Sequence, residues 1–94
     1  MGAAEKKEDC TFTALGFRGP YKSMLISVKL GESVDGAAND FITLDDHELA
    51  CTTIVSVRAF IFATGESTQY SYATNVLTKE TADDTRDVIE VIYK

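Results

Sequence analysis

The densest group of potential metal ligands and catalysts is the run Asp45, Asp46, His47 and Glu48. A metal site needs ligands that converge on one point, and four consecutive side chains of a turn or strand diverge. The alternating acids and following glycine of a calcium-binding loop are absent, and His47 is the single histidine of the chain. We interpret the run as a solvated turn and expect no metal site.

His47 and Cys51 are spaced four residues apart, which would place a base beside a nucleophilic thiol if the segment were helical. The segment has the composition of a polar turn, however, and Cys51 opens an apolar run typical of a strand. We therefore expect Cys51 to be a structural thiol rather than a catalytic one.

The remaining acids give no pattern for acid–base catalysis. Asp83 and Asp84 lie in a threonine-rich segment with turn chemistry, and Glu90 lies alone between valines and isoleucines. For Glu90 we expect a place on the outward side of a strand, or a charge that discourages pairing at a sheet edge. No glycine run follows a strand and opens a helix, so no phosphate-binding loop is indicated. The sequence predicts no catalytic or cofactor-binding residues, no cofactor and no enzymatic activity.

Two pairs of aromatic residues are spaced by two, which places each pair on one face of a strand. Such residues serve as stacking platforms for single-stranded nucleic acid or glycans, as cross-strand pairs in a sheet, or as protein interfaces. Fifteen acids against nine bases argue against the basic footprint of nucleic-acid binding. A protein interface is therefore better supported than nucleic-acid binding, and its candidate residues are Phe60, Phe62, Tyr70 and Tyr72. For Tyr70 and Tyr72 we expect ordinary packing in the sheet, with the interface as the alternative.

The chain has 94 residues, which is the size of one domain. No apolar run approaches the ~18 residues of a membrane-spanning helix, and residues 1–9 lack the apolar stretch of a secretion signal. We expect no membrane partner. Without a secretion signal, Cys10 and Cys51 are expected to be reduced and partly buried, and a disulfide between them is the alternative.

The chain reads as strands separated by turn residues. Residues 21–30 alternate between apolar and polar side chains, as in a strand with one buried face. Residues 51–63 are apolar on both faces towards their C-terminal half, which predicts a strand covered on two sides. The other expected strands are residues 10–17, 40–44, 68–77 and 87–93.

These about six strands predict an all-β fold, a small β-sandwich or barrel with at most one short helix. An α+β fold with a helix over residues 45–53 is the alternative. We expect an N-terminal tail at residues 1–9 and a single β domain at residues 10–94.

Three stretches resemble small virion proteins of tailed bacteriophages, in particular capsid decoration or head-associated proteins. They are the Gly/Asp-rich loop 31–39 leading into strand 40–44, the apolar strand 52–62 followed by Gly65, and the terminal strand 88–94. The resemblance implies a non-enzymatic protein located in the virion. It also implies symmetric assembly, often trimeric, and an end segment that docks on neighbouring subunits or on a larger shell protein.

Three functional hypotheses follow. The first is a structural or assembly protein that binds a protein shell through its β domain and tail. The second is a protein-binding accessory module of a cellular complex, with a cytoplasmic location. The third is an enzyme or small-molecule binder, which requires a deep pocket with convergent polar groups.

Overall fold

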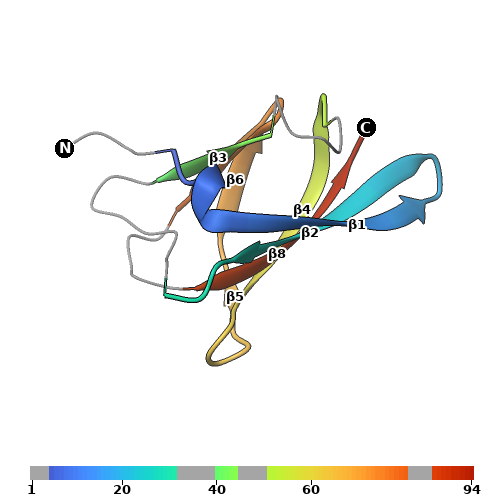
Figure 1. Cartoon of the computed structure of the whole chain (residues 1–94). Helices are drawn as coiled ribbons and strands as arrows, with labels where there is room; N and C mark the ends of the chain where they lie inside the picture. Colours follow the sequence, from blue (N-terminus) through green and yellow to red (C-terminus); the bar gives the residue numbers. More distant parts are fainter. Residues whose placement is uncertain (1–4, 32–39, 45–50, 81–85) are drawn as a thin grey trace.

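The computed structural model describes residues 5–31, 40–44, 51–80 and 86–94, which form eight strands and one 3-10 turn (Figure 1). The all-β prediction is confirmed. The elements are η1 (Lys7–Asp9), β1 (Cys10–Arg18), β2 (Tyr21–Val28), β3 (Phe41–Thr43), β4 (Ile54–Ile61), β5 (Ser67–Thr68), β6 (Tyr70–Ala73), β7 (Val76–Lys79) and β8 (Asp87–Tyr93).

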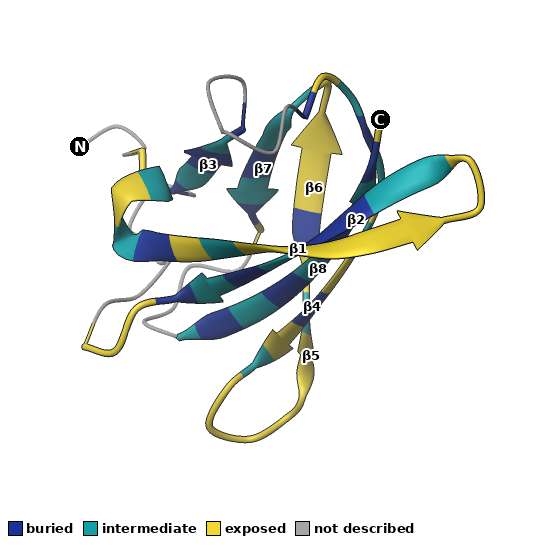
Figure 2. Cartoon of the chain, turned by 45° about the vertical axis from the view of Figure 1, so that its right-hand side comes forward, coloured by how far each residue is buried: buried dark blue, intermediate teal, exposed yellow. Residues whose placement is uncertain are grey.

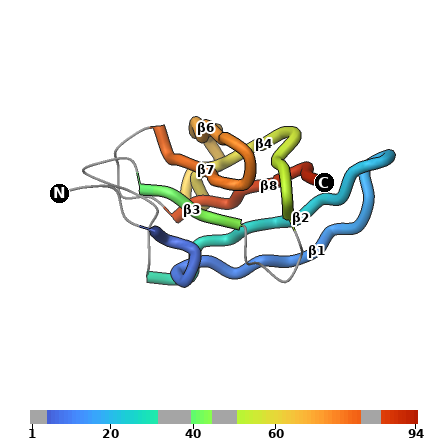
Figure 3. The backbone as a smooth tube through the Cα atoms, turned by 90° about the horizontal axis from the view of Figure 1, so that it is seen from above, coloured from blue at the N-terminus to red at the C-terminus, as the bar shows by residue number. Residues whose placement is uncertain are grey.

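The strands form two antiparallel sheets, with the orders β1-β2-β8-β4-β5 and β3-β7-β6. The C-terminal strand β8 lies at the centre of the larger sheet, between β2 and β4. In Figure 3, β7 and β6 of the smaller sheet lie at the β4 side of the larger sheet, and β1 lies at the opposite side. No helix in the described part of the chain is long and apolar enough to cross a membrane.

The core lies between the two sheets and follows the period-two pattern of the sequence (Figure 2). In β8, Ile89 and Val91 point inwards, and across the ladder they pair with Ile26 and Met24 of β2. The smaller sheet adds fully buried side chains such as Leu77. Removing each of these side chains from water contributes roughly 1.5–3 kcal/mol to folding.

The prediction of a single strand at residues 68–77 is wrong. The structure divides it into β5, β6 and β7, because the chain reverses at Thr74 and Asn75 and pairs Ala73 with Val76. Thr74 has φ 56°, a left-handed conformation that β-branched residues rarely adopt. No glycine marks this turn, so the sequence pattern continues through it, and the described strands number eight rather than about six.

Residues 5–9 lie against β3, so this part of the predicted tail belongs to the folded domain. The Lys6 N–H donates to the Phe41 carbonyl (2.8 Å), and a carboxylate oxygen of Glu5 accepts from the Thr43 N–H (3.0 Å). The Lys6 ammonium also lies 3.6 Å from a carboxylate oxygen of Asp40. Residues 1–4 of the predicted tail, and most of the alternative helix at 45–53, lie outside the described residues.

Candidate protein-binding surface

The outward face of the larger sheet carries two of the four predicted interface residues. In β4, Val57 and Ala59 pair with the core-facing residues of β8, so Phe60 points to the opposite side, where it pairs with Val88. Phe62 follows on the same side, just beyond the strand. Both rings are accessible, with 36% of Phe60 and 57% of Phe62 exposed.

The two predicted tyrosines of β6 face the larger sheet instead. Tyr70 is only 8% exposed, and its hydroxyl donates to Asp87 Oδ2 (2.6 Å). Tyr72 is partly exposed at the margin of the sandwich, where its hydroxyl donates to the Val55 carbonyl (2.8 Å). Tyr70 therefore belongs to the interior, and only Tyr72 presents an aromatic edge to solvent.

Glu90 lies at the centre of the outward face with an arginine on each side. One carboxylate oxygen is 2.9 Å from Arg18, which reaches over β2 from the end of β1, and the other is 3.8 Å from Arg58 of β4. Both guanidinium groups are mostly exposed. Because β8 is a central strand, Glu90 does not guard an edge; it neutralises part of an arginine cluster.

The arginines also contact the phenylalanines. The Arg86 guanidinium lies 4.0 Å from the centre of the Phe62 ring while its Nε donates to the Val28 carbonyl (2.8 Å), and Arg58 lies 5.8 Å from the ring of Phe60. Cation–π contacts of this kind hold both groups in place. We name the arginine–aromatic surface as Arg18, Arg58, Phe60, Phe62, Arg86 and Glu90.

Sequence reasoning missed the three arginines of this surface, although a signal for two of them was present. Arg58 has the same parity as Phe60 in its strand, and Arg86 the same parity as Glu90. Side chains at these positions must share a face once the strands are assigned. Arg18 carries no such signal, because a bulge between Ala14 and Gly16 shifts its register.

The β1–β2 hairpin projects from the body of the domain, and its end is largely exposed (Figure 2). It carries further exposed apolar side chains. Phe17 is 77% exposed, and Leu15, at the bulge, is also exposed. Gly16 (φ 99°) permits the backbone of this bulge. The ion pair of Arg18 with Glu90 ties the hairpin to the arginine–aromatic surface.

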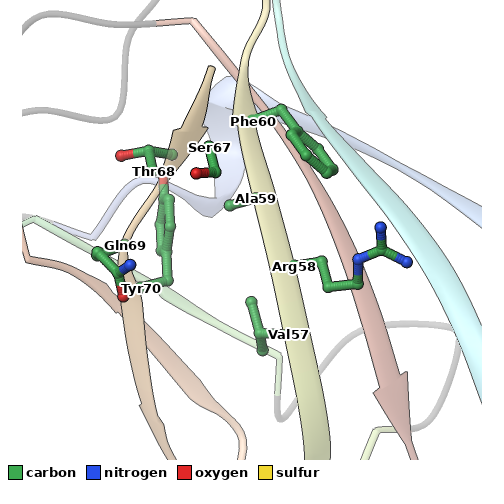
Figure 4. A pocket seen from close by; sticks show the side chains of 8 residues that line it. All are labelled: Val57, Arg58, Ala59, Phe60, Ser67, Thr68, Gln69 and Tyr70. Carbon is green, nitrogen blue, oxygen red and sulfur yellow. The ribbon is translucent and has the colours of Figure 1, made fainter. Parts of the chain in front are cut away.

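A hollow of about 270 Å³ lies where β4 meets β5 and β6 (Figure 4). Val57 and Ala59 point towards Tyr70 across it, whereas Arg58 and Phe60 point to the other side of β4. Thr68 and Gln69 supply neutral polar groups at its rim. The hollow is slightly smaller than the usual size range of ligand sites, and the hydroxyl of its one tyrosine is already engaged with Asp87.

Both cysteines are free and buried, as expected. Burial raises the pKa of the Cys10 thiol to about 12, with Asp9 adding to the effect, and raises the pKa of Cys51 to about 11. A thiol with such a pKa stays protonated at neutral pH and is a poor nucleophile. This agrees with the structural role predicted for Cys51.

The described residues contain no group of three or more His, Cys, Asp or Glu side chains able to hold a metal ion. The run Asp45 to Glu48, together with Asp83 and Asp84, lies outside the described part of the chain. The expectation of a solvated turn at residues 45–48 therefore stays a prediction.

Comparison of the chain with protein-family models, with curated proteins and with solved structures returned no match.

Proposed function

We propose that this protein is a non-enzymatic structural domain that assembles with further copies of itself through the arginine–aromatic surface. One observation carries the proposal: the outward face of the larger sheet combines exposed Phe60 and Phe62 with three arginines that contact Glu90 or the aromatic rings. Aromatic residues and arginine are the types enriched in protein interfaces and in their energetic hot spots.

The charge distribution favours a second copy as the occupant of this surface. All nine lysines and arginines lie in the described residues, together with eight acids. The sequence segments 32–39, 45–50 and 81–85 carry the other seven acids and no lysine or arginine. Because the chain carries a formal net charge of −6, a neighbouring copy brings an excess of negative charge to a surface rich in arginine. Contact between unlike surfaces of identical chains produces a closed ring when the rotation permits, and a trimer is one such ring.

More specifically, we propose that the protein is a small virion component that decorates a capsid shell. It rests on the resemblance of residues 31–44, 52–65 and 88–94 to tailed-bacteriophage proteins, and the apolar tip of the β1–β2 hairpin offers a second contact for the shell. The alternative is an accessory module of a cellular complex, in which the same hairpin would engage a different protein and the chain would not self-associate.

Sedimentation velocity over a concentration series of three proteins tests the proposal. Phe62→Ser removes an exposed ring from the arginine–aromatic surface and releases Arg86. Leu30→Ser removes a side chain that is even more exposed but lies outside this surface, and it serves as the matched control. We expect Phe62→Ser to dissociate at concentrations at which the parent and the control remain assembled. Equal behaviour of the two variants would contradict the assignment of this surface.

A further inference from the structure

Lys79 and Asp87 form an ion pair that is completely enclosed between the two sheets. The Lys79 ammonium, at the end of β7, donates to Asp87 Oδ2 at 2.8 Å, and both side chains are 0% exposed. The pair joins the smaller sheet to the central strand of the larger one. Tyr70 lies beside it, with its ring centre 5.8 Å from Lys79 Nζ and its hydroxyl on the same Asp87 oxygen at 2.6 Å.

The bonding at Asp87 is uneven. Oδ2 accepts from both Lys79 and Tyr70, whereas Oδ1 is buried without a hydrogen-bond partner among the described residues. An ionised carboxylate that is buried with one oxygen unpaired carries a large desolvation penalty, which its ion pair offsets only in part. A reaction that converts the two charged groups into one neutral group removes this penalty.

We propose that Lys79 and Asp87 condense into an intramolecular isopeptide bond. A proton passes from the Lys79 ammonium to Asp87 Oδ2, which gives an amine beside a carboxylic acid. The Nζ lone pair then attacks Cγ to form the C–N bond. A second proton moves from Nζ to Oδ2, the Cγ–Oδ2 bond breaks, and one water leaves. The product is a neutral amide, no oxidant or reductant takes part, and atoms and charge balance.

Each neighbouring group has a place in this reaction. The amine and the carboxyl group are held in contact before the reaction, which converts a bimolecular condensation into a unimolecular one. Tyr70 donates its hydrogen bond to the oxygen that departs, and so stabilises the charge that develops on the leaving group. The unpartnered Oδ1 becomes the amide carbonyl oxygen, which carries less charge and costs less to bury.

The bond would link the two layers of a domain that has no disulfide among its described residues. Small domains bury little apolar surface per residue, and covalent links are a common compensation. This inference is independent of the proposed interface, since it concerns the interior and would hold equally for a monomer.

Mass spectrometry of the purified full-length protein, denatured after folding, tests the inference. We expect the intact mass to be one water below the value calculated from the sequence. After trypsin digestion we expect residues 59–86 to remain joined to residues 87–94 in one branched product, because an acylated Lys79 is not cleaved. Lys79→Met lacks the amine and should show the full calculated mass, and Tyr70→Phe should form the bond more slowly.

Two results would overturn the inference. One is a folded wild-type protein with the full calculated mass that releases free peptides 80–86 and 87–94. The other is a loss of water confined to peptide 87–94 with no link to Lys79, which would indicate cyclisation of Asp87 with its own backbone. Both are read from the wild-type protein alone, so the outcome does not depend on whether any variant folds.

Discussion

Replacing Thr74 with glycine should stabilise this protein, although glycine normally weakens β structure. Thr74 is exposed at the turn between β6 and β7 and has φ 56°. Its side chain forms none of the described contacts, whereas its backbone carbonyl accepts the Ile54 N–H at 2.6 Å. The left-handed conformation costs a β-branched residue roughly 1–2 kcal/mol and costs glycine nothing.

The net change in the free energy of unfolding is the strain energy that is released minus the entropic cost of ordering glycine on folding. That cost is roughly 0.5–1 kcal/mol, so the free energy of unfolding should rise by about 0.5–1 kcal/mol. For a domain of this size, 1 kcal/mol corresponds to a rise of about 4–8 °C in Tm. The hydrogen bond to Ile54 is made by the backbone and survives the substitution.

Urea unfolding monitored by circular dichroism measures this change, and Thr78→Gly is the matched control. Thr78 is half-buried within β7 and pairs with Phe41 and Ser71. The same substitution there should lower the free energy of unfolding by about 1 kcal/mol. Opposite signs at two threonines of one hairpin are the expected result. A loss of stability in Thr74→Gly comparable to that of Thr78→Gly would refute the strain argument.

Three further predictions concern the thiols, the ion pairs and the hairpin. Burial raises the pKa of Cys10 from 9.0 to about 12 and that of Cys51 from 9.0 to about 11, so above pH 9 the folded state holds more protons than the unfolded chain. The free energy of unfolding should therefore fall as pH rises, by on the order of 1 kcal/mol per pH unit for each thiol, and Cys10→Ala should flatten this dependence in a pH series of urea titrations. Glu90→Gln should lower the free energy of unfolding by less than about 1 kcal/mol, and by less still at high salt, because the arginine partners of Glu90 are largely exposed. A loss of several kcal/mol, or a loss that does not depend on salt, would contradict this. Gly16→Ala, at φ 99°, should lower Tm by several degrees through backbone strain of roughly 1 kcal/mol, and an unchanged Tm would contradict the bulge geometry.

Period-two alternation predicted the strand that became β2 and its one buried face, and runs of β-branched residues predicted the strand that became β8. In the structure Ile26 of β2 pairs with Ile89 of β8, and both side chains are buried. Alternation works here because one face of each strand packs against the second sheet while the other stays partly accessible.

The interior polar groups were missed for a related reason. Lys79 has the parity of Leu77, and Asp87 the parity of Ile89, so alternation alone places both charges inside. Composition argues the opposite, because lysine and aspartate are almost never fully buried without a partner. Lys79 and Asp87 can be assigned to the interior only once it is known that β7 and β8 bring them together as an ion pair, and this depends on how the two sheets pack.

The candidate surface was predicted only in part. Phe60 and Phe62 lie on it because their strand parity opposes that of the core-facing Ala59. Tyr70 and Tyr72 show the same spacing, but β6 belongs to the other sheet and turns this face inwards. Spacing reveals which residues share a face, but which face is covered depends on long-range packing.

If the outward face of the larger sheet joins copies of this chain, light scattering of the wild-type protein across a concentration series will detect the assembly. We expect a closed oligomer whose mass is a whole multiple of 10.3 kDa and does not change over the upper part of the series. A mass of 10.3 kDa at every concentration would contradict self-assembly through the arginine–aromatic surface.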